Sequence, residues 1–218
     1  MSRRGAALVL VAALAAAAAA RADPLDPHVR LTRSDQAVAA ASVLRFGDLG
    51  PAWSGGAVAP RSLKIPLCPV QPNNSDLVIT GHAESTLTLP SQGLQVDSDV
   101  EILQTARQAG LLAARILRPG LGGCLAYDLL RSGLAGGSTT VGRVTRLPVA
   151  AVAGRVALYR VVLTVLTHGQ RVEVFSDYLF LTRGRTQFFV NVISPGNLAG
   201  ELKSFENAIA KTLAGRGI

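Results

Sequence analysis

Four strand-like segments joined by short turns fill the C-terminal half of the chain and limit the fold more than any other feature. They span residues 139–154, 155–167, 170–182 and 186–194, with turns at Gly154, His168-Gly169 and Gly184. Short turns join antiparallel neighbours, because parallel strands need a crossover of a dozen or more residues. The sequence therefore predicts an antiparallel meander whose second and third strands are central and covered on at least one face.

A second strand region, residues 76–103, precedes this meander. Residues 76–89 are rich in β-branched side chains, residues 90–93 predict a turn, and residues 94–102 alternate apolar with polar side chains. Helices are predicted over residues 34–46, from Thr105 to the stop at Pro119, over 121–132, and over 196–215 as a closing amphipathic helix. The Pro- and Gly-rich residues 48–74 are predicted to be loop.

This arrangement defines the predicted fold class. Strands and helices are segregated along the chain more than they alternate. The class is therefore α+β, a mostly antiparallel β-sheet with helices packed on one face and one disulfide.

Residues 1–22 have the pattern of a secretory signal peptide. Arg3 and Arg4 precede an uncharged, mostly alanine run, and Ala20-Arg21-Ala22 is a small-x-small cleavage site. The run is shorter than the roughly 20 residues that span a bilayer, although an uncleaved anchor is the alternative. We expect a secreted or extracytoplasmic protein in which residues 23–218 form one domain, compact over about 35–214, with no membrane span after cleavage.

The chain contains two cysteines, Cys68 and Cys124. In an exported protein such a pair favours a disulfide, because two thiols supply only half of a tetrahedral zinc shell. The prediction is a Cys68–Cys124 disulfide that fixes a Pro-rich segment to the fold. A redox-active thiol pair is the alternative.

Charge and motifs argue against several functions. The net charge is +8, but the arginines are scattered without interleaved aromatic residues, so no nucleic-acid partner is predicted. The chain has no Gly-x-Ser-x-Gly, no His-Glu-x-x-His and no Gly-rich phosphate loop. We therefore predict no catalytic residues, no metal site and no cofactor.

His82 and Glu84 are two residues apart on a predicted strand, so they share one face. A carboxylate there could orient the imidazole for chemistry or metal binding, but a surface or edge-strand pair is the favoured interpretation. Asp97, Asp99 and Glu101 follow on another strand, nearly 7 Å apart at alternate positions, which is too far for adjacent carboxylates to share a calcium ion. They are expected to form a solvated acidic face that discourages edge pairing.

Asp177 lies mid-strand among apolar residues, and Arg160 has a similar place in the preceding strand. If the two are opposite each other, they form either a structural ion pair or the polar floor of an apolar pocket. Trp53 is predicted to be buried against the core, with exposed recognition as the alternative. The candidate ligand contacts are thus Trp53, Arg160, Asp177, Tyr178, His82 and Glu84.

Several segments carry a resemblance to a known family. They are DLGPAW, the Pro-flanked cysteine in PLCP, VDSDVEILQTARQA, GGCL and RGRTQFFVNVISP. Over about residues 35–214 the chain resembles small exported actinobacterial domains, among them the extracellular sensor domain of membrane Ser/Thr protein kinases (PknH-like), and more distantly the PsbP-like group. The resemblance implies a non-catalytic binder of a ligand or partner.

Two classes of function follow. The first is an exported, sensor-like binding domain that holds a small apolar ligand or a cell-envelope partner between sheet and helices. It predicts an apolar pocket with few polar groups. The alternative is a secreted hydrolase in which His82, Glu84 or Asp177 converges with a serine or a metal. Side chains on opposite faces of the sheet would exclude that convergence.

Overall fold

The structure is a computed structural model that describes residues 25–59, 73–131, 139–167 and 170–218. The predicted signal peptide and Cys68 lie outside these residues. None of the described helices is both long enough and apolar enough to cross a membrane.

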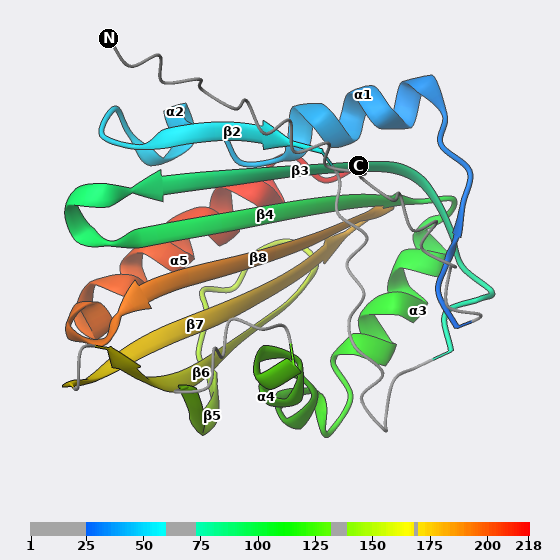
Figure 1. Ribbon diagram of the computed structural model, residues 1–218. Coiled ribbons are helices and arrows are strands. Elements are labelled where there is room, and N and C mark those ends of the chain that lie inside the picture. The colour runs from blue at the N-terminus through cyan, green and yellow to red at the C-terminus, as the bar shows by residue number, and fades with distance from the viewer. Residues whose placement is uncertain (1–24, 60–72, 132–138, 168–169) are drawn as a thin grey trace, which may run out of the picture.

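One sheet organises the described residues (Figure 1). Its order is β1-β3-β4-β8-β7-β6-β5, and β2 also pairs with β3. All pairings are antiparallel except the one between β1 and β3. The strands are β1 His28–Val29, β2 Ser54–Val58, β3 Val78–Leu89, β4 Leu94–Leu103, β5 Thr139–Leu147, β6 Arg155–Thr167, β7 Gln170–Arg183 and β8 Thr186–Pro195. The α+β class and the mostly antiparallel sheet are confirmed.

The predicted meander is β5-β6-β7-β8, and its turns at Gly154 and Gly184 have positive φ values of 110° and 54°. The turn predicted at His168-Gly169 lies outside the described residues. β5 ends at Leu147, earlier than predicted, and residues 148–154 form an irregular connection in which Ala150 donates its backbone N–H to Asn207 Oδ1. A helix side chain there replaces the hydrogen bond that a longer strand would have made.

The upstream hairpin, β3 and β4, also matches the prediction. Its turn is the short 3-10 helix Pro90–Gln92, followed by Gly93 in the left-handed region at φ 66°. The apolar positions of β4 are buried on one side, and they are Leu94, Val96, Val100 and Ile102. The period-2 pattern therefore gave both the strand and its buried face.

The prediction that residues 48–74 are all loop is wrong in its first part. Helix α2, Phe46–Leu49, reaches into this segment, and β2 pairs along β3 from Ser54↔Thr88 to Val58↔Glu84. The β2 sequence SGGAV has low intrinsic strand preference. Pairing with an already ordered neighbour determines its conformation instead.

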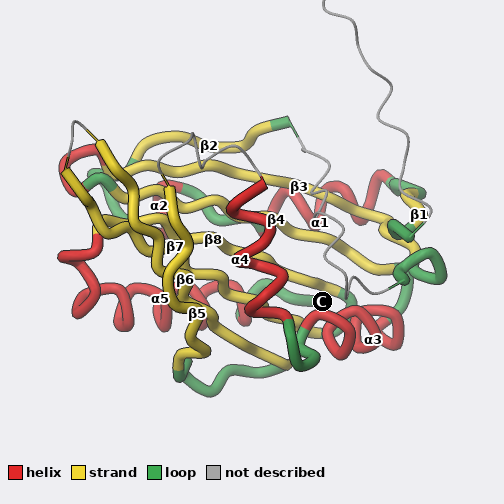
Figure 2. The backbone as a smooth tube through the Cα atoms, turned by 60° about the horizontal axis from the view of Figure 1, so that its bottom comes forward, coloured by secondary structure: helices red, strands yellow, loops and turns green. Residues whose placement is uncertain are grey.

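The helices cover both faces of the sheet, so the prediction of helices on one face is wrong. Helices α1, Arg33–Ser42, and α5, Ala199–Ala214, cover what we call the first face. Helices α3, Ala106–Ile116, and α4, Leu121–Arg131, cover the second face. Figure 1 shows α5 behind the sheet and α4 in front of it, and in Figure 2 α4 crosses in front of the strands.

Helices cover both faces of the sheet because β7 is buried on both sides. Leu179 and Leu181 pack into the first-face core, whereas Tyr178 and Phe180 pack into the second. A strand that is apolar at consecutive positions requires a layer on each face. The sequence contained this signal, but it did not show which helices form each layer.

The predicted fold class also included a Cys68–Cys124 disulfide, and this part of the prediction is corrected. Cys68 lies in residues 60–72, outside the described residues, so the described part of the structure contains no cysteine pair. The described fold is an α+β sheet held by packing and hydrogen bonds. Cys124 is in α4, is 8% exposed and is not a free thiol.

Candidate functional site

The six candidate ligand contacts lie on opposite faces of the sheet. Those on the first face are Trp53, Arg160 and Asp177. Those on the second are His82, Glu84 and Tyr178. A hydrolase site that combines His82 or Glu84 with Asp177 is therefore excluded by the geometry.

Arg160 and Asp177 lie directly opposite each other on β6 and β7, as predicted. Arg160 Nε is 2.8 Å from Asp177 Oδ1, and Arg160 Nη2 is 2.6 Å from Asp177 Oδ2. The guanidinium also lies 4.4 Å above the centroid of the Phe175 ring. Asp177 is fully buried, so this bidentate pair is a structural ion pair.

Glu206 of α5 completes this first-face cluster. Its Oε1 is 3.7 Å from Arg160 Nη2, and the residue is 1% exposed. Burial raises the pKa of Glu206 to about 9, and the neighbouring Asp177 adds to the increase. Glu206 is therefore protonated near neutral pH, and one arginine faces one charged carboxylate.

A pocket of about 250 Å³ lies beside Trp53 on the first face. Trp53 is 8% exposed and stacks on Phe205 of α5, with ring centroids 5.5 Å apart and planes 5° from parallel. The predicted burial of Trp53 is confirmed. The lining is apolar except for Gln92 and Glu201, and the apolar members are Leu49, Trp53, Leu89, Leu94, Leu198, Leu202 and Phe205.

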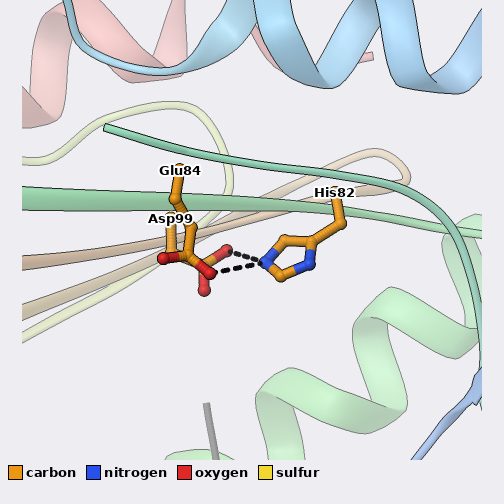
Figure 3. Close-up of side chains that lie close together, drawn as sticks. All are labelled: His82, Glu84 and Asp99. Carbon is orange, nitrogen blue, oxygen red and sulfur yellow. Dashed lines mark ion pairs between the residues drawn. The ribbon is translucent and has the colours of Figure 1, made fainter. Parts of the chain in front are cut away.

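A second cluster lies on the second face, where His82 and Glu84 of β3 meet Asp99 of β4 (Figure 3). Glu84 is directly opposite Asp99 in the register. His82 Nε2 is 3.4 Å from Glu84 Oε1 and 3.2 Å from Asp99 Oδ1. Figure 3 shows the imidazole edge facing both carboxylates.

Electrostatics in this cluster favour protonation. Burial raises the pKa of Asp99. Burial also raises the pKa of Glu101, which is opposite His82 in the register, to about 8, with Asp99 as the next cause. Burial alone would lower the pKa of His82, but the neighbouring carboxylates, Asp99 foremost, raise it on balance.

The prediction of a solvated acidic face at Asp97, Asp99 and Glu101 is therefore wrong. β4 is an inner strand between β3 and β8, and Asp99 is 5% exposed. Carboxylates along one strand are too far apart to act together, but a neighbour on the adjacent strand is close. The register of the β3–β4 hairpin, fixed by its tight turn, was the signal that could have paired Glu84 with Asp99.

Tyr178, the remaining candidate, packs in the second-face core. It is 5% exposed, and its ring lies 5.7 Å from that of Phe189, tilted by 39°. It lies beneath α4, in the cluster that contains Leu125 and Leu129. Its place is that of a core side chain.

No protein-family model matches the chain, and no curated protein matches its sequence. Among solved structures, the chain is similar to an uncharacterised protein from Mycobacterium smegmatis, the Rv0999 ortholog. The two are 10% identical with a TM-score of 0.43, and the match covers 83% of this chain and 98% of the other.

Proposed function

We propose that this protein is an exported, non-catalytic binding domain that holds the apolar part of a small amphipathic ligand in the pocket beside Trp53. The observation that carries the proposal is the pocket lining, in which Gln92 and Glu201 are the two polar members. Small-molecule sites typically combine an apolar wall with a few placed polar groups.

The size of the pocket limits what it can take. A dry cavity of roughly 150 Å³ holds one benzene ring, whereas whole drug-sized ligands need roughly 300–1,000 Å³. A pocket of about 250 Å³ therefore suits one or two fused rings or a short branched chain. The polar remainder of the ligand would lie outside, where Glu201 favours an amine or hydroxyl group.

Two further arguments support a binding role. The signal-peptide pattern of residues 1–22 favours secretion or residence in the cell envelope. The resemblance to PknH-like sensor domains implies a binder without catalysis. The alternative hydrolase could not combine Asp177 with the His82–Glu84 pair in one site, because they lie on opposite faces.

Native mass spectrometry on protein purified from the medium of its own host tests the proposal first. We expect extra mass in the native spectrum that disappears on denaturation. The chain has a single tryptophan, and it lines the pocket, so fluorescence of Trp53 can follow rebinding of the extracted ligand.

Leu49→Arg should abolish retention by placing a charge in the pocket wall, and Leu111→Arg is the matched control. Leu111 is an exposed leucine on α3, which lies on the second face. Equal ligand retention by both variants, or a bare native spectrum of the wild type, would contradict this function.

A further inference from the structure

The cluster on the second face has the spacing of metal ligands. A tetrahedral zinc centre with bonds of about 2.0–2.1 Å places neighbouring donor atoms roughly 3.3 Å apart. His82 Nε2 is 3.2 Å from Asp99 Oδ1 and 3.4 Å from Glu84 Oε1. Donor atoms of all three residues lie within 4.8 Å of one another.

Asp99 supplies a second and independent observation. The residue is 5% exposed, and neither of its carboxylate oxygens has a hydrogen-bond partner. His82 Nε2, which faces it, also has none, so their contact lacks hydrogen-bond geometry. Buried polar groups in this state are costly, and a bound cation would satisfy His82 Nε2 and the Asp99 oxygen that faces it at once.

Asp99 has no permanently charged partner among the described residues. In the described part of the protein, no arginine or lysine forms an ion pair with Asp99, and His82 is its one ion-pair partner. Asp97, two residues earlier on the same face of β4, differs. It accepts hydrogen bonds from Thr86 Oγ1 and Gln95 Nε2, so its carboxylate is satisfied by neighbours.

We propose that His82, Glu84 and Asp99 bind a divalent transition-metal ion of the zinc type. One imidazole and two carboxylates suit zinc, whereas calcium takes six to eight oxygen ligands and magnesium keeps an octahedral shell rich in water. Three protein ligands leave a fourth position of a tetrahedral ion for water or an exogenous ligand. The site is separate from the pocket beside Trp53, so it stands whether or not that pocket binds a ligand.

The scaffold favours a defined site. All three ligands come from adjacent inner strands, and β3 is itself flanked by β2 at Glu84. Side chains on paired strands are held more accurately than those on loops. The competing explanation is a metal-free cluster in which a protonated His82 bridges the two carboxylates.

Isothermal titration calorimetry with ZnCl₂, on chelator-treated protein purified without a polyhistidine tag, separates the two explanations. We expect one equivalent of Zn²⁺ to bind, and Ca²⁺ and Mg²⁺ to bind at least about 100-fold more weakly. Asp99→Asn and His82→Ala should each weaken Zn²⁺ binding by roughly 100-fold or more, since even residues behind the ligands are worth 10- to 100-fold. Asp97→Asn, the matched control, should bind as the wild type does.

Co²⁺ gives a second readout, because its visible absorption reports coordination geometry. The wild type and Asp97→Asn should show an intense four-coordinate spectrum that Asp99→Asn lacks. Circular dichroism and Trp53 fluorescence, which reports the opposite face, verify that each variant folds. No Zn²⁺ binding to the wild type, or equal losses in Asp97→Asn and Asp99→Asn, would overturn the proposal.

Discussion

The sheet buries a charged cluster on each face, and the two clusters are balanced differently. On the first face, the guanidinium of Arg160 is paired with Asp177 through two hydrogen bonds, and Glu206 avoids excess charge by holding a proton. On the second face, Glu84 and Asp99 share one imidazole. In the first cluster an arginine pairs with Asp177, whereas among the described residues Asp99 of the second cluster has no arginine or lysine partner, and that difference separates a structural ion pair from a candidate ligand site.

The largest effect is expected on the first face. Arg160→Met should lower the free energy of unfolding by about 3–5 kcal/mol, because it leaves Asp177 buried without a cation. Urea denaturation measures the change. The double variant Arg160→Met/Asp177→Leu should recover most of the loss, since it removes the uncompensated charge. A double variant as unstable as the single one would show that packing, not charge balance, explains the effect.

The next largest effect is expected at Glu206, whose raised pKa makes the stability of the protein depend on pH. Its pKa is about 9 in the folded protein and roughly 4.5 when unfolded, so the folded state retains a proton between these pH values. Its stabilising contribution is full below pH 4.5 and is lost as pH rises, by up to about 1.4 kcal/mol per pH unit. Glu206→Gln should show a flatter decline in thermal melts from pH 6 to 9, and Glu201→Gln, on the exposed first turn of α5, should not.

Removing a charge from the second-face cluster should have the opposite effect and stabilise the protein. Asp99→Asn removes one of two carboxylates that lie directly opposite each other, so it should stabilise the metal-free protein by roughly 0.2–1 kcal/mol at pH 8. Asp177→Asn, the same chemical change in the balanced cluster, should destabilise it. Chemical denaturation of both variants in a chelating buffer provides the measurement. Destabilisation by Asp99→Asn would mean that its charge is already compensated.

The smallest effect is expected at an exposed pair with similar geometry. Arg115 Nη1 is 2.6 Å from Asp76 Oδ1, but the Asp76 side chain is 54% exposed. Arg115→Gln should cost at most about 1 kcal/mol in urea denaturation, and 0.5 M NaCl should reduce the cost further. A loss as large as that of Arg160→Met would show that burial is not what distinguishes the clusters.

Much of the fold followed from local pattern. The period-2 alternation in β4, the short turn at Gly184 and the capping Thr105, whose Oγ1 accepts from the Gln108 N–H, each act over a few residues. β2 could not be predicted in the same way, because its SGGAV sequence becomes a strand only beside β3. The helix layers depend on long-range packing that no local pattern encodes.

The candidate sites also divide into those that the sequence could predict and those that only the folded chain shows. The pairing of Arg160 with Asp177 could be predicted because both lie in strands joined by one hairpin. Asp99 was dismissed because spacing was considered along one strand, whereas its partners His82 and Glu84 lie across the hairpin. The pocket beside Trp53 brings together α2, the β3–β4 turn and α5, which are far apart in sequence, so only the folded chain shows it.

The pairing of β4 with β8 also has a kinetic consequence. It joins Gln95 to Ile193 and Ile102 to Thr186, and thus links the hairpin that carries the carboxylate cluster to the last strand of the meander. Contacts this distant in sequence form slowly, because loop closure must precede any gain from pairing. Until β8 is in place, one edge of β4 has no partner strand. The hairpin that carries the second-face cluster has local contacts of its own, but β4 becomes an inner strand only when β8 pairs with it, so the burial of the site depends on the whole sheet.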